Sequence, residues 1–300
     1  MFQKFKKAMN STGTKMKHTG NMLKSQASGV SDPDKKKRFE TYKGSKNERY
    51  LHVETVFKGA EYKGKIVLVV GGGHGIGPDL VRTLHEHHAA VMTTVPEDFK
   101  IKFPHGVQVL SGIDPANAAD AQKITKALEW RNVDVVIVNE PATKPSPNAV
   151  TCGINAKAAH QMFDAHALAP VNVISALVST GSLKTGSKVV NINNQDASIT
   201  WRKVQGEAPF DYGYHMARCA ANMAMQLLSV ELKEMGITVV SVHPGFNKTE
   251  LTAHEEDNYD EEGAVDPDIG AMRTLHEINR LNPKKNGKFI NVEDGLNIPW

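Results

Sequence analysis

A glycine-rich turn is the first feature of this chain with a defined chemistry. Residues 70–77 read VGGGHGIG and follow a short apolar run at residues 66–70. In such a turn one glycine permits the tight bend, a second lets a phosphate approach the backbone, and a third allows close packing of the next helix. That helix offers free N–H groups and a partial positive charge to a pyrophosphate at its first turn. The spacing therefore predicts a dinucleotide-binding turn.

Short apolar strands alternate with helical periodicity around this turn and position it. The apolar run at residues 133–138 is continuous, as expected of a strand covered on both faces. We expect strands at residues 66–70, 90–92, 107–110, 133–138, 188–192, 237–242 and 286–291. We expect helices at residues 78–87, 116–130, 156–179 and 214–235. This alternation favours an α/β fold with a doubly wound parallel sheet, a single Rossmann-like domain at residues 65–300.

The N-terminal part of the chain has a different composition. Residues 1–50 carry 13 Lys and Arg against 4 Asp and Glu, a net charge of +9, so the other 250 residues carry −6 of the overall +3. Few β-branched apolar residues occur here, and such a segment cannot bury enough surface to form a core. We therefore predict that residues 1–64 are a basic, partly disordered or extended arm. The arm is either a solubilising tail or a tether to an acidic surface, such as an acidic protein, RNA or anionic lipid.

Cysteine content and hydropathy indicate the cellular compartment and whether a membrane span is expected. The two cysteines, Cys152 and Cys219, form no disulfide framework or metal-ligand pattern, which favours a reducing intracellular compartment. We expect a cytoplasmic protein, with an organelle as the alternative. No apolar run approaches the roughly 20 residues of a membrane span, so we predict no transmembrane segment. No metal site is predicted.

Several motifs together resemble the short-chain dehydrogenase/reductase family, in its carbonyl-reductase-like branch with the C-factor and Sniffer-type proteins. The resemblance covers residues 65–300. It is carried by the GxxxGxG spacing of the turn, by YGY at residues 212–214, by AANM at 220–223, by VHPGFNKT at 242–249 and by the ending at 287–300. The resemblance implies a Rossmann fold and NAD(P)-dependent oxidoreductase chemistry.

The family's catalytic tetrad is altered in this chain. The resemblance places Tyr214 at the tyrosine that exchanges a proton with the substrate, and Arg218 at the lysine that lowers the tyrosine pKa. Asn194 falls at the serine position and His166 at the asparagine position. A planar guanidinium cannot easily copy the point charge of a lysine. Without that charge the pKa of a tyrosine stays at about 10, so we expect a roughly tenfold to ten-thousandfold loss of activity.

The cofactor contacts implied by the resemblance are partly kept. Glu140 and Pro141 differ from the family residues at their positions. The proline could crowd a cofactor and the glutamate could repel it. His74 stands where NADP users often have a basic residue, which leans toward NADP over NAD, and the site could also bind neither. The expected cofactor-binding residues are Gly71, Gly73, His74, Gly75, Ile76, Gly77, Asn139, Pro244, Gly245 and Thr249.

Three functions are consistent with this pattern of conserved shape and altered chemistry. The first is a non-catalytic structural or accessory subunit of a larger assembly, with the basic arm as its anchor. The second is an active NADP(H)-dependent carbonyl or alcohol oxidoreductase with an altered tetrad. The third is a sensor that binds NAD(P) without turnover. We expect the chain to belong to a protein assembly or to form a homo-oligomer.

Overall fold

A parallel sheet organises the chain in the computed structural model, which describes residues 35–129, 131–139, 143, 153–202 and 211–300. Within these residues seven strands form one sheet in the order β3-β2-β1-β4-β5-β6-β7. The strands are β1 (Ile66–Val70), β2 (Ala90–Val95), β3 (Gln108–Ser111), β4 (Val133–Val138), β5 (Leu183–Ile192), β6 (Thr238–His243) and β7 (Phe289–Asn291). All neighbouring pairs are parallel, so the prediction of a doubly wound, Rossmann-like sheet is confirmed.

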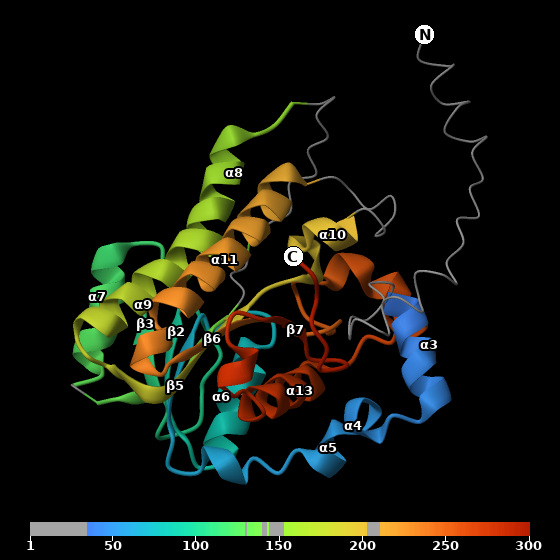
Figure 1. Cartoon of the computed structure of the whole chain (residues 1–300), viewed down its shortest axis with the longest axis horizontal. Helices are drawn as coiled ribbons and strands as arrows, with labels where there is room; N and C mark the ends of the chain where they lie inside the picture. Colours follow the sequence, from blue (N-terminus) through green and yellow to red (C-terminus); the bar gives the residue numbers. More distant parts are fainter. Residues whose placement is uncertain (1–34, 130, 140–142, 144–152, 203–210) are drawn as a thin grey trace.

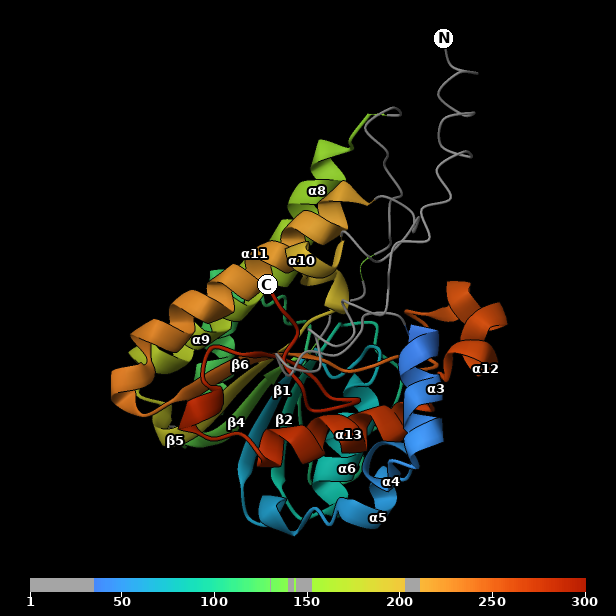
Figure 2. The same cartoon turned by 45° about the vertical axis from the view of Figure 1, so that its right-hand side comes forward.

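Helices cover both faces of this sheet (Figures 1 and 2). One face carries α6 (Gly77–Glu86) and α13 (Pro267–Asn279), and the other carries α7 (Ala118–Ala127), α9 (Ala169–Ser179) and α11 (Tyr212–Glu231). Successive strand residues point to opposite faces of the sheet. Val67 packs in the core beneath α6 and α13, and Leu68 packs in the core beneath α7, α9 and α11. Fully apolar strands are required because neither face meets water.

The predicted helix at residues 156–179 is built from three pieces. They are α8 (Ala156–Phe163), a π-helical turn η3 (Asp164–Leu168) and α9. By length and composition this stretch could cross a membrane, contrary to our expectation that no segment would qualify. The finding is weak evidence for a span, because 44% of its most apolar window is buried in the fold and core helices pass the same test.

Residues 35–62 differ from the extended arm predicted for residues 1–64. They form α3 (Lys35–Ser45), α4 (Glu48–Leu51), α5 (Val53–Val56) and η1 (Ala60–Tyr62), which run beside α13 and under the sheet (Figure 2). Val53 and Tyr62 are each 1% exposed, and the Tyr62 hydroxyl donates to the Leu275 carbonyl oxygen at 2.8 Å. Widely spaced apolar residues between lysines make this packing hard to read from composition. Residues 1–34 lie outside the described part of the chain.

The remaining elements are short and lie mainly around the carboxyl ends of the strands. They are η4 (Gln195–Ala197), α10 (Ile199–Arg202), η5 (Lys233–Met235), η6 (Ala253–Asn258), α12 (Tyr259–Glu262) and η7 (Pro283–Lys285). Residues 249–262, which include η6 and α12, are called the lid segment below. In open α/β sheets ligands bind outside these strand ends. The carboxyl ends of the strands are therefore the expected place of a ligand site.

Candidate active site

The glycine turn joins β1 to α6 as predicted. Gly71 has a φ of +78°, and a Cβ on Gly77 would lie 2.8 Å from the Gly71 carbonyl oxygen, so side chains here would strain or block the turn. Asn139, directly after β4, donates from Nδ2 to the carbonyl oxygens of Gly71 at 2.9 Å and of His74 at 2.8 Å. Ile76 is 4% exposed and anchors the turn in the core. These contacts hold the turn in one shape.

Several N–H groups of the turn have acceptors within the chain. Gly71 donates to Thr94 Oγ1 at 2.9 Å. Gly75 donates to Glu250 Oε1 at 2.7 Å, and His74 Nδ1 lies 3.8 Å from the same oxygen. The hydrogen bond with His74, and less strongly the one from Gly75, lower the pKa of Glu250 against the opposing effect of burial. The turn therefore already holds an anion, which the chain itself supplies.

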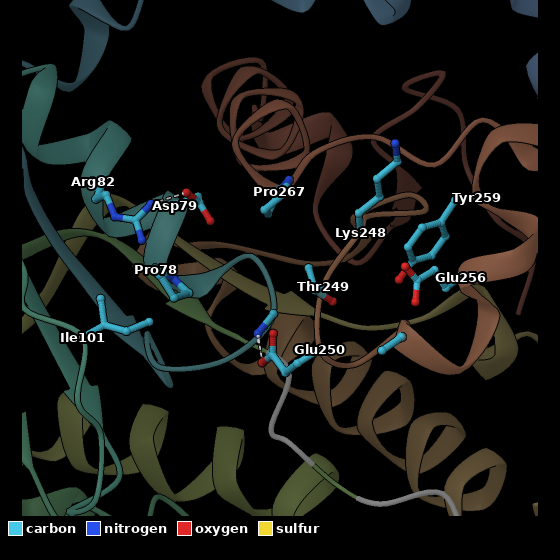
Figure 3. Close-up of a pocket in the computed structure, with 12 residues that line it drawn as sticks. Pro78, Asp79, Arg82, Ile101, Lys248, Thr249, Glu250, Glu256, Tyr259 and Pro267 are labelled. Atoms are coloured by element: carbon cyan, nitrogen blue, oxygen red, sulfur yellow. Dashed lines mark hydrogen bonds and ion pairs between the residues drawn. The ribbon is translucent and has the colours of Figure 1, made fainter.

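A pocket of about 450 Å³ opens beside Glu250 (Figure 3). Gly75 lines it from the glycine turn and Pro78 and Arg82 line it from α6. Lys248, Thr249 and Tyr259 line it from the segment after β6. Of the predicted cofactor residues, Gly75 and Thr249 therefore share one pocket.

Three other predicted cofactor residues make contacts within the chain near the pocket. Gly73 faces the side chain of Phe99, which would lie 3.0 Å from a Cβ at that position. The Pro244 carbonyl oxygen accepts from Asn247 Nδ2 at 3.1 Å. Gly245 has a φ of +80° and packs against Glu293. Glu140 and Pro141, which the sequence suggested could crowd a cofactor, lie outside the described residues.

Tyr214 lies on the first turn of α11, next to the loop after β5. The Asp211 carboxylate caps this helix by accepting from the Tyr214 N–H at 3.0 Å. The side chain of Asn194 hydrogen-bonds the Tyr214 hydroxyl, and this bond lowers the tyrosine pKa. Burial has the larger, opposite effect, and the neighbouring Asp196 carboxylate adds to it, so the net pKa of Tyr214 is raised well above 10. Tyr214 therefore stays protonated at neutral pH.

His166 completes the cluster from the facing helix. Its ring meets the Tyr214 ring edge to face, with centroids 5.8 Å apart, and its Nε2 lies 3.0 Å from Thr143 Oγ1. Burial lowers the pKa of His166 to about 4, so the imidazole is neutral. It lies in the π-helical turn η3, and such turns are frequent at functional sites. The structure thus brings together the predicted positions Asn194, His166 and Tyr214.

Arg218 lies behind the tyrosine ring. Its side chain is 1% exposed, its guanidinium carbon is 4.8 Å from the Tyr214 ring centre, and Nη1 donates to Asn193 Oδ1 at 3.3 Å. Burial lowers the pKa of Arg218, but a guanidinium remains charged at neutral pH. The charge lies over the ring, and burial is the main cause of the raised pKa of the tyrosine.

Sequence reasoning missed several residues at the site. Arg38 of α3 is 4% exposed and donates from Nη2 to Gln195 Oε1 at 2.9 Å, next to Asn194, and pairs with Glu293 at 3.3 Å. The Arg38 charge is the largest of the influences that lower the Glu293 pKa to about 2 against the effect of burial. Glu250 was also missed, although it directly follows Thr249. The described residues contain no cluster of three or more metal-ligating side chains.

Comparison with known proteins identifies relatives of this fold and site. The short chain dehydrogenase family profile matches residues 65–260. An uncharacterized oxidoreductase of Schizosaccharomyces pombe is 28% identical over 79% of this chain and 98% of its own. The 1-hydroxy-2-glutathionyl-2-methyl-3-butene dehydrogenase of Rhodococcus is 25% identical over 78% and 99%. C-signal of Myxococcus xanthus is 29% identical over 46% and 76%.

Solved structures agree on the fold. The carbonyl reductase Sniffer of D. melanogaster has a TM-score of 0.65 at 23% identity, over 79% of this chain and all of its own. A carbonyl reductase from chicken fatty liver with NADPH bound also has a TM-score of 0.65, at 20% identity and the same coverage. Residues 35–62 precede the segment that the family profile matches.

Proposed function

Since this chain belongs to the short-chain dehydrogenase family, we propose that it is an oxidoreductase that reduces a carbonyl compound with NADPH or NADH. One observation carries the proposal: at the sheet edge that also holds the glycine turn, Asn194 hydrogen-bonds the Tyr214 hydroxyl and the His166 ring packs edge to face against the Tyr214 ring. Relatives named as oxidoreductases and neighbours named as carbonyl reductases support this function over a purely structural one.

The glycine turn fits the pyrophosphate of a dinucleotide. Its Gly75 N–H, just before α6 begins, donates to the Glu250 carboxylate, whose oxygen would stand in for a phosphate oxygen. Asn139 fixes the turn, and Thr249 would contact the cofactor from the opposite side of the pocket. Bound there, the nicotinamide supplies the hydride. The last residues of β2, Thr94 and Val95, include no acidic side chain of the kind that would select NAD, which supports NADP as the preferred cofactor.

The protonation state of Tyr214 favours reduction over oxidation. Its raised pKa keeps the phenol protonated at neutral pH, so Tyr214 can give its proton to the substrate oxygen as that oxygen gains charge. Oxidation of an alcohol would require the phenolate, which this environment disfavours. Asn194 can donate from its amide to the same oxygen, and neutral His166 can hold a water beside it.

A second candidate function is a non-catalytic subunit, either a structural component or a nucleotide sensor. The position of Arg218 favours it, because a cation over the ring positions the tyrosine without lowering its pKa. An exposed apolar stripe on α11 would support self-association or assembly. Its residues are Met216, Met223, Leu227 and Val230. The basic residues within 1–34 would in this case bind an acidic protein, RNA or anionic lipid.

Oxidation of NADPH and NADH with a panel of aldehydes and ketones tests the proposal. We expect carbonyl-dependent oxidation that falls roughly a hundredfold or more in Tyr214→Phe, because the proton donor is lost. Tyr212→Phe, on the exposed side of the same helix, is the matched control and should keep its activity. Equal rates for Tyr214→Phe and the unmodified chain would rule out this chemistry.

A further inference from the structure

The Glu250 carboxylate occupies the position that the pyrophosphate of a dinucleotide needs. It accepts from the Gly75 N–H at 2.7 Å, just before α6 begins, where the helix dipole favours an anion. His74 contacts the same oxygen. One N–H cannot donate fully to two anions, and a carboxylate beside a pyrophosphate is repelled by it. Glu250 and a bound dinucleotide therefore exclude each other at Gly75.

We propose that Glu250 is an internal competitor for the cofactor, so that dinucleotide binding requires the lid segment to leave the glycine turn. This inference rests on the proposed function, because it concerns the cofactor of the same site. Glu250 then sets the affinity of the chain for NADPH without touching the reacting atoms.

The lid segment is tied together near Glu250. Thr252 Oγ1 accepts from the Thr249 N–H at 3.1 Å and lies 3.0 Å from the Tyr259 hydroxyl. These bonds connect the residues on either side of Glu250 to α12. A movement of Glu250 away from Gly75 therefore involves the lid segment as a unit.

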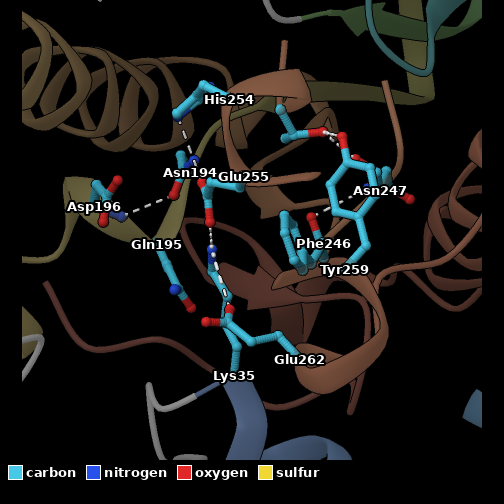
Figure 4. Close-up of polar contacts among 12 residues, drawn as sticks. Lys35, Asn194, Gln195, Asp196, Phe246, Asn247, His254, Glu255, Tyr259 and Glu262 are labelled. Atoms are coloured by element: carbon cyan, nitrogen blue, oxygen red, sulfur yellow. Dashed lines mark hydrogen bonds and ion pairs between the residues drawn. The ribbon is translucent and has the colours of Figure 1, made fainter. Parts of the chain in front are cut away.

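Helix α3 holds this segment in place through complementary charge. Lys35 Nζ lies 2.9 Å from Glu255 and 3.8 Å from Glu262 (Figure 4). Lys36 pairs with Glu261. Lys35 Nζ also lies 4.1 Å from the centre of the Phe246 ring, at the base of the segment. The basic helix thus finds an acidic surface within its own chain.

This restraint is an addition to the family fold. Helix α3 precedes residues 65–260, which the family profile matches, whereas Glu250 and Glu255 fall inside them. Glu250, the competitor, belongs to the domain shared with the family. The ion pairs of Lys35 and Lys36 with the lid segment, called the clamp below, belong to the N-terminal extension. Weakening either one should expose the glycine turn.

Titration calorimetry with NADPH and the full-length chain tests the competitor. We expect Glu250→Gln to lower the Kd for NADPH about tenfold or more, because a charge-assisted hydrogen bond to Gly75 is replaced by a weaker neutral one. Asp257→Asn is the matched control, since Asp257 is an exposed residue of the same lid segment that does not line the pocket. Its Kd should equal that of the unmodified chain.

Charge reversal on α3 tests the clamp. We expect Lys35→Glu to lower the Kd for NADPH by up to about fivefold, the range of a partly exposed ion pair. Lys58→Glu makes the same charge change at an exposed position away from the lid and should leave the Kd unchanged. Hydrogen exchange without cofactor gives an independent readout, because Glu250→Ala should speed exchange of the Gly75 amide.

The outcomes separate this inference from the proposed function. An equal Kd for the unmodified chain and Glu250→Gln would overturn the competitor and leave the reductase proposal standing. Tighter binding by Glu250→Gln without any turnover would support the competitor and contradict the reductase. No NADPH binding in any variant would overturn both.

Discussion

The Arg218 guanidinium covers one face of the Tyr214 ring, 4.8 Å from its centre. A cation over an aromatic face is attracted by the ring, so this contact helps to fix the tyrosine in place. A lysine ammonium at the hydroxyl would instead lower the tyrosine pKa. This chain therefore positions its proton donor firmly and leaves it a weak acid, which has consequences for pH dependence.

Reductase activity should not fall on the alkaline side through ionisation of Tyr214. The raised pKa keeps the phenol protonated, so kcat for carbonyl reduction should show no tyrosine-dependent break below about pH 9. Steady-state rates between pH 6 and pH 9, at saturating NADPH, check this. A break near neutral pH that disappears in Tyr214→Phe would show that the tyrosine pKa is lowered after all.

Removal of Arg38 should destabilise the whole domain. Arg38→Ala removes the 3.3 Å partner of the Glu293 carboxylate, whose side chain is only 12% exposed, and breaking such a largely buried pair costs about 3 kcal/mol. Urea unfolding measures the free energy directly. Lys43→Ala, an exposed residue of the same helix, should change it by less than about 0.5 kcal/mol. Similar stability for both variants would mean that α3 is not part of the folded unit.

Acid should destabilise the protein through His243. Burial, the largest influence, lowers the pKa of His243 to about 3 in the folded chain, against 6.5 for the ordinary group. As the pH falls below about 6.5, the unfolded chain takes up a proton that the folded chain does not, so stability is lost between about pH 6.5 and pH 3.

Calorimetric melting at pH 7.5 and pH 5 tests this assignment. In His243→Gln the drop in Tm between the two pH values should shrink by about 4 °C. His52→Gln, whose side chain is exposed, is the control and should keep the full drop. An unchanged drop in His243→Gln would assign the acid sensitivity to other groups.

The exposed stripe on α11 should mediate self-association. Leu227 is 63% exposed, and Leu227→Glu places a charge in an apolar interface at a large cost. Sedimentation velocity should show a smaller species for Leu227→Glu than for the unmodified chain. A monomer in both cases would contradict an interface on α11.

Local patterns in the sequence predicted the sheet and the glycine turn, whereas the cluster around Tyr214 was predicted only from the resemblance to a family. The continuous apolar run of β4 and the glycines of residues 71–77 depend on local requirements that any chain with this fold must meet. The contact of Glu250 with Gly75 joins residues 175 positions apart, and no local periodicity encodes it. The burial of Arg38 likewise depends on Gln195 and Glu293, so a basic composition alone suggested a solvated arm.

The central claim is that this chain transfers hydride to a carbonyl compound, and isotope transfer tests it most directly. Enzyme in excess is mixed with NADPH deuterated at the transferred position of the nicotinamide and with the carbonyl panel, and the products are analysed by mass spectrometry. The account predicts deuterium on the former carbonyl carbon, and none with Tyr214→Phe over the same time. Unlabelled products with every substrate would contradict it and favour the non-catalytic subunit.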